Sequence, residues 1–123
     1  MSFDADIFRV VRMGDDRSEA DLYAILTHYQ DTYFPDAKVR VEAVEFASAL
    51  ESPGVVETGG SSALIKVDER LRYFPKLCCF IVLHELINNM LFWKCGSVQP
   101  YGGAVFQEEV KRLWQANAYC GLL

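Results

Sequence analysis

The chain has 123 residues, of which 51% are hydrophobic and 24% are charged, and its formal net charge is −5. This apolar content excludes a disordered or low-complexity chain, and the length predicts one domain over residues 1–123. The acidic charge and the lack of a run of Lys and Arg argue against direct nucleic-acid binding.

The N-terminal third of the chain predicts a helix. Acidic residues stand where a secretory signal would carry basic ones, so we expect a cytoplasmic protein with no membrane attachment. Residues 7–13 could form a short extra strand. The side chains of Ser18 and Asp21 can accept hydrogen bonds from free backbone N–H groups, which predicts a helix start there. Apolar residues at three- and four-residue spacing continue this helix to Tyr33, and Pro35 ends it.

Three short strands are expected next, over residues 38–46, 54–58 and 63–67. In the first, apolar and charged residues alternate, which is typical of a strand with one solvated face. Pro and Gly pairs bracket the second strand. Because the connections are too short for a parallel crossover, we expect a small antiparallel three-stranded sheet.

Two helices are expected after the sheet. Residues 77–93 are apolar almost all round, and Gly96 beyond them is suited to end a helix. This segment is too short and too polar for a membrane span, so it predicts a buried central helix. Residues 106–114 predict an amphipathic C-terminal helix, which completes an α+β fold.

The polar residues of the central helix need a chemical explanation. A carboxylate on an apolar helix is costly unless it is paired, neutralised or used. His84 and Asn88 are one helical turn apart and Glu85 follows His84, which is the spacing of the H-E-x-x-H zinc motif with its second histidine missing.

Several further segments carry a family resemblance. A helix ends in Tyr33-Phe34-Pro35, the strand Ile65-Lys66-Val67 precedes the central helix, and that helix contains His84-Glu85-Leu86-Ile87. A Gly-x-x-Phe segment at 103–106 then opens the last helix. In this order of elements the chain resembles the SprT-like zinc metallopeptidase family, over roughly its last hundred residues, and the resemblance implies a zincin-like fold.

The resemblance also implies roles for individual residues. His84 matches the first metal ligand and Glu85 the general base, whereas Asn88 stands at the second ligand position and Gly102 at the third. A catalytic zinc needs three protein ligands and an open position for water. The resemblance therefore implies a metallopeptidase homologue that has lost zinc and catalysis, and that acts, if at all, by binding a protein or peptide.

Other interpretations remain open from the sequence. A divergent metal-dependent peptidase could use His84 as ligand, Glu85 as base and Glu108 (or its neighbour Glu109) as a substitute ligand, with His28 arriving through folding; zinc would then be its cofactor. Alternatively, His84 and Glu85 are hydrogen-bonded polar groups of the core. A third interpretation is a small interaction module unrelated to peptidases, which binds peptides at a sheet edge.

Overall fold

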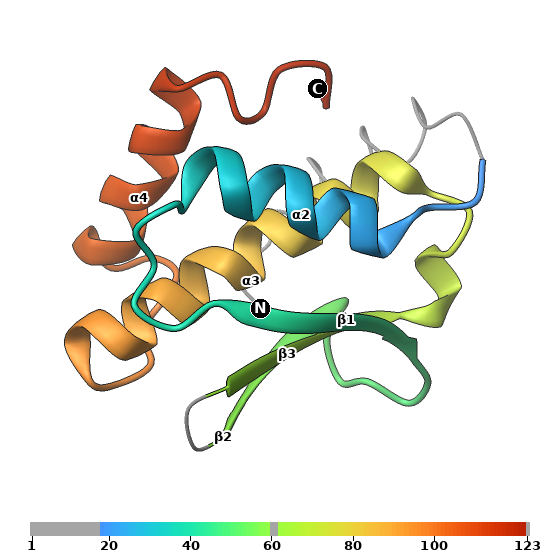
Figure 1. Cartoon of the computed structure of the whole chain (residues 1–123), viewed down its shortest axis with the longest axis horizontal. Helices are drawn as coiled ribbons and strands as arrows, with labels where there is room; N and C mark the ends of the chain where they lie inside the picture. The colour runs from blue at the N-terminus through green and yellow to red at the C-terminus, as the bar shows by residue number, and fades with distance from the viewer. Residues whose placement is uncertain (1–17, 60–61, 123) are drawn as a thin grey trace.

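The structure is a computed structural model that describes residues 18–59 and 62–122, and it has an α+β fold (Figure 1). The expected class, with an N-terminal, a central and a C-terminal helix around a three-stranded sheet, is confirmed. The expected N-terminal strand at residues 7–13 lies outside the described residues. In chain order the elements are α2 (Leu22–Tyr33), β1 (Val41–Ala47), β2 (Gly54–Gly59), β3 (Ser62–Asp68), the 3-10 helix η1 (Glu69–Leu71), α3 (Pro75–Cys95) and α4 (Ala104–Gln115).

The sheet is mixed, with strand order β1–β3–β2. Strand β2 pairs antiparallel to β3, as expected, but β1 pairs parallel to β3, so the prediction of an all-antiparallel sheet is wrong. Strands β1 and β3 are not consecutive in the chain. Strand β2 connects them, so no crossover helix is needed. Strand β3 lies at the centre of the sheet, and its Ala63, Ile65 and Val67 are all buried there.

Helices α2 and α3 cover one face of this sheet (Figure 1). Alternate residues of β3 point toward them, and the buried side chains of the described residues form a cluster between helices and sheet. On the other face, the ammonium group of Lys66 on β3 lies 2.8 Å from the carboxylate of Glu57 on β2. The sheet therefore has one apolar and one solvated face.

The helix ends follow the predicted signals. Asp21 caps α2 by accepting a hydrogen bond from the Ala24 N–H at 3.0 Å. Helix α3 begins at Pro75 and closes at Gly96, which has a φ of 78°, and the Gly96 N–H donates to the Phe92 carbonyl at 2.9 Å. These bonds satisfy backbone groups at the helix ends.

Helix α3 alone in the described part of the chain is long and apolar enough to cross a membrane by length and composition. However, 61% of its most apolar 18-residue window is buried inside the molecule. The core helix of a globular domain has this pattern, so the expected buried central helix is confirmed.

Two buried amide side chains attach the helices to the region of β1. Gln30 on α2 donates to the Val41 carbonyl at 3.0 Å, and its own carbonyl accepts from the Val41 N–H at 2.8 Å. Asn89 on α3 donates to the Val39 carbonyl at 2.8 Å and accepts from the Trp93 indole N–H at 3.0 Å. Gln30 and Asn89 are only 3% and 1% exposed, so these bonds hold the start of β1 in place.

Candidate functional site

The residues that the sequence singled out are only partly brought together. His84, Glu85 and Asn88 lie on consecutive turns of α3, whereas Gly102 is exposed in the loop before α4. Glu108 is exposed on α4. The site must therefore be judged mainly from the side chains of α3 and from what packs against them.

Glu85 connects α3 to the edge strand β2. Its side chain is nearly buried, since the residue is 4% exposed. One carboxylate oxygen accepts a hydrogen bond from the Asn88 amide nitrogen at 3.0 Å, and the backbone N–H of Val56 also donates to the carboxylate. Burial raises the pKa of Glu85 to about 7, although both hydrogen bonds favour the charged form.

The His84 imidazole is held in an aromatic environment. Its ring centroid lies 4.3 Å from that of Tyr101, in the loop before α4, and 5.0 Å from that of Phe106 on α4. Burial lowers the pKa of His84 to about 4, so the imidazole is neutral at physiological pH. The His84 side chain therefore packs between α3 and the segment that leads into α4.

The described residues do not fit a zinc ion. Within residues 18–59 and 62–122, no three side chains of His, Cys, Asp or Glu come together in a group that could hold a metal. The Asn88 amide nitrogen faces Glu85, and no described residue other than the chain neighbours of Gly102 has an atom within 4 Å of the position that a Cβ atom there would occupy. His28 lies on α2, with its ring against Tyr29 and Tyr33.

A groove runs between β2 and α3, with Glu85 and Asn88 in its wall. Its volume is about 240 Å³. The β2 side is lined by Gly54, Val56 and Thr58, which share the helix-facing side of the strand. The opposite wall consists of Glu85, Asn88, Phe92, Val98 and Tyr101.

Strand β2 forms an edge of the sheet, and part of that edge is already hydrogen-bonded. In an antiparallel ladder, alternate residues direct both backbone groups away from the neighbouring strand. The bond from the Val56 N–H to Glu85 places Val56 in that outward set, together with Gly54 and Thr58. The Gly54 carbonyl accepts a hydrogen bond from the Ser52 hydroxyl at 2.7 Å. The outward groups of Thr58 remain directed to the groove side of the edge.

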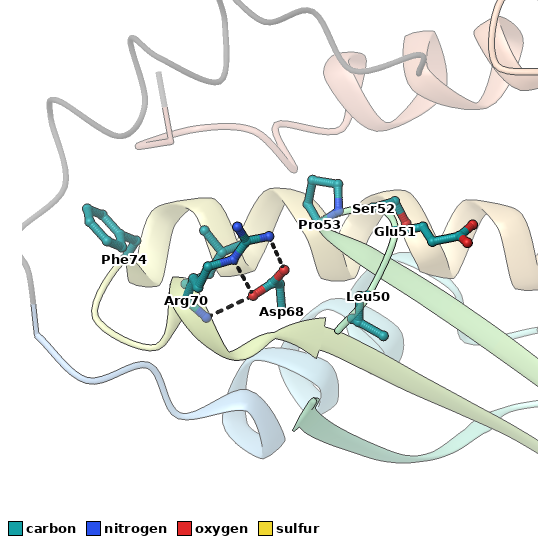
Figure 2. A pocket seen from close by; sticks show the side chains of 8 residues that line it. Leu50, Glu51, Ser52, Pro53, Asp68, Arg70 and Phe74 are labelled. Atoms are coloured by element: carbon teal, nitrogen blue, oxygen red, sulfur yellow. Dashed lines mark hydrogen bonds and ion pairs between the residues drawn. The ribbon is translucent and has the colours of Figure 1, made fainter. Parts of the chain in front are cut away.

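A separate cavity of about 450 Å³ lies where β3 continues into η1 (Figure 2). Here Asp68 accepts hydrogen bonds from the guanidinium of Arg70, at 3.0 and 2.6 Å, and from the Arg70 backbone N–H at 2.9 Å. Hydrogen bonds from the guanidinium lower the pKa of Asp68 below its ordinary value. These bonds satisfy the carboxylate and fix the start of η1, so we assign Asp68 a structural role.

The sequence suggested a peptide-binding sheet edge beside the central helix but not that β2 would provide it, and the Asp68–Arg70 pair was not singled out. The Asp-x-Arg spacing directly after an apolar strand could have indicated the second, because Asp at a helix start accepts from the backbone N–H two residues on. The edge position of β2 has no signal in the sequence, since it depends on which strand takes the centre of the sheet.

No model of a known protein family matches the chain, and no curated protein matches it either.

Proposed function

We propose that this chain is a metal-independent peptide-binding module that receives an extended segment of another protein along the outer edge of β2. The observation that carries the proposal is the groove between β2 and α3. In it, an edge strand lies opposite the helix that contains His84-Glu85. Strand addition uses such an edge: its backbone groups provide affinity, and the neighbouring pockets provide specificity.

The groove has the chemistry that this binding mode needs. The outward backbone groups of Thr58 can pair with an incoming strand. Val98 is 77% exposed and Phe92 is half-buried, so the wall opposite β2 offers apolar surface to alternate side chains of the peptide.

The relationship to SprT-like metallopeptidases is part of this proposal. The His84-Glu85 pair on a buried helix beside an edge strand supports it, together with the Gly-x-x-Phe segment that opens α4. The absence of a three-ligand group among residues 18–59 and 62–122 favours binding over hydrolysis. In this interpretation Glu85 is not a general base but a tether between α3 and β2.

A substitution at Thr58 tests the binding mode. Peptides selected from a phage-displayed random library against the wild-type chain are synthesised with a fluorescent label and titrated by anisotropy. Thr58→Pro removes the outward N–H without touching the bonds to β3, and we expect at least about tenfold weaker binding. Thr58→Ala, which keeps the N–H, is the matched control. Equal binding to both variants, or no selected peptide above background, would overturn the proposal.

Elemental analysis of protein purified without chelators tests the absence of metal. We expect far less than one zinc per chain. One bound zinc that is lost in His84→Ala would instead support the divergent peptidase.

A further inference from the structure

Among the described residues, Glu85 is the one charged side chain that lines the groove between β2 and α3. The other lining residues are Gly, Val, Ser, Thr, Asn, Phe and Tyr, none of which is charged at neutral pH. The hydrogen bonds to Glu85 come from two neutral donors, the Asn88 amide and the Val56 N–H. No Lys, Arg or His in the described part of the chain forms an ion pair with it. The charge of this carboxylate is therefore not offset by a cation of residues 18–59 and 62–122.

The position of Glu85 makes an unpaired charge costly. The residue is only 4% exposed, so its carboxylate has lost most of its hydration. Buried charges in proteins are usually paired with an opposite charge. Because Glu85 lines a groove, a ligand in that groove can supply the missing cation. The net charge of −5 also attracts a basic segment to this chain from a distance.

The rest of the groove suits a long basic side chain. Phe92 and Tyr101, both half-buried, line it together with the exposed Val98. Apolar and aromatic surface can pack against the aliphatic stem of Lys or Arg, and aromatic rings attract the cation at its end. The groove therefore offers apolar surface for the stem and a carboxylate for the charged group.

We propose that the peptide that binds along β2 carries a Lys or Arg side chain that pairs with Glu85. This inference rests on the function proposed above and names the chemical class of the bound segment. Backbone pairing at Thr58 sets the register, and alternate residues of an added strand share the helix-facing side. The peptide residue two positions from the one opposite Thr58 lies about 7 Å further along the strand, beside Val56, whose N–H donates to Glu85. The basic residue is expected at that position.

Peptides selected from the random library test the inference on the wild-type chain. We expect the peptides whose binding is weakened by Thr58→Pro to share a Lys or Arg at one position. One of them is synthesised with an acetylated N-terminus, which removes the terminal amine as an alternative cation, and is titrated by fluorescence anisotropy. The titration is done at about pH 8.5, where Glu85 is charged, because burial raises its pKa to about 7. Replacing the shared basic residue by Gln should weaken binding at least about tenfold.

Variants of the chain locate the cation. Glu85→Gln removes the charge but keeps an acceptor for the Val56 N–H. It should weaken binding of the basic peptide at least about tenfold and change the affinity for the Gln peptide by less than about twofold. Glu57→Gln is the matched control, since it removes the same charge from β2, but Glu57 does not line the groove and pairs with Lys66 on the solvated face. Circular dichroism verifies that each variant is folded, and the two peptides test the inference on the wild-type chain in any case.

Three outcomes would overturn this inference alone. They are selected peptides that share no basic residue, equal binding of the basic and Gln peptides to wild type, and an equal loss of affinity in Glu85→Gln and Glu57→Gln. The last would assign the preference to general attraction by an acidic chain. In each of these cases the peptides still bind and still respond to Thr58→Pro, so the function proposed above stands. A failure to select any peptide would overturn both.

Discussion

His84 and Glu85 are neighbours in the chain, and burial shifts their pKa values in opposite directions. The pKa of Glu85 rises from 4.5 to about 7, so between these values the folded chain keeps a proton that the unfolded chain releases. The free energy of unfolding therefore falls as pH rises through this range. The pKa of His84 falls from 6.5 to about 4, so this histidine makes the free energy of unfolding fall as pH drops from 6.5 toward 4. The two contributions oppose each other.

Single variants should separate these contributions. Relative to wild type, Glu85→Gln should gain stability as pH rises from about 4.5 to about 7, and His84→Asn should lose stability as pH rises from about 4 to about 6.5, each by up to about 1.4 kcal/mol per pH unit. Urea denaturation followed by tryptophan fluorescence across this range measures both profiles. Profiles of the variants that run parallel to that of wild type would show that neither group is buried as described.

Gly54 is a second residue whose role depends on close packing. A Cβ atom at this position would lie 2.2 Å from Cγ2 of Ile81, a side chain of the core. We expect Gly54→Ala to lower the free energy of unfolding by about 1–3 kcal/mol, measured by urea denaturation. The cost should shrink when Ile81→Ala is present, since the clashing atom is removed.

Gly102→Ala is the matched control for this measurement. Apart from its chain neighbours, no described residue has an atom within 4 Å of its Cβ position, so the free energy of unfolding should change by less than about 0.5 kcal/mol. A Gly54→Ala protein as stable as wild type would mean that β2 does not approach α3 as closely as described.

At the site, the sequence predicted which polar residues of α3 required an explanation but not what they bond to. His84, Glu85 and Asn88 were recognisable because polar groups on an apolar helix are rare. Their partners were not, because the Val56 N–H and the Tyr101 ring come from segments whose distance from α3 is set only by tertiary packing. Glu108 was a reasonable candidate from its place on the next helix, but it is exposed.

At the level of elements, the helices depend on buried amides for their attachment to the sheet. Gln30→Leu leaves the Val41 N–H and carbonyl without their side-chain partners, and Asn89→Leu does the same to the Val39 carbonyl and the Trp93 indole. We expect each substitution to lower the free energy of unfolding by about 2–4 kcal/mol, because each leaves two polar groups unpaired. Urea denaturation measures this loss. Gln115→Leu, at an exposed glutamine of α4, should change it little.

The elements themselves were largely predictable, because their signals are local. Asp21 and Gly96 marked helix ends correctly. Hydrophobic spacing identified α2 and α4, and a run of residues that is apolar almost all round identified α3. The strand order was not predictable in this way. Short connections suggested that β1 and β2 would pair, but β3 lies between them. In this position Ile65 and Val67 are fully buried, and burial of their apolar surface stabilises this strand order.

At the scale of the whole molecule, restoring histidines tests the proposed relationship to zinc metallopeptidases. In the double variant Asn88→His, Gly102→His, the new side chains would stand at the positions that the proposed alignment assigns to the second and third ligands. The position of Gly102 has room for a side chain. We expect about one zinc per chain by elemental analysis after gel filtration, at the cost of the Asn88–Glu85 bond. A third change, His84→Asn, should abolish binding. If the double variant binds no zinc, the proposed alignment of the ligand positions is wrong.

Both edges of the sheet carry an outward backbone group that a helix side chain already occupies: Gln30 bonds to Val41 on β1, and Glu85 bonds to Val56 on β2. Open edges are templates on which copies of a protein join into aggregates. These two side chains therefore reduce the number of open edge groups in a chain that is half hydrophobic. Among the described residues of β2, the bonds at Gly54 and Val56 leave Thr58 with its outward backbone groups directed to the groove, so a segment that joins β2 pairs mainly at that end of the strand.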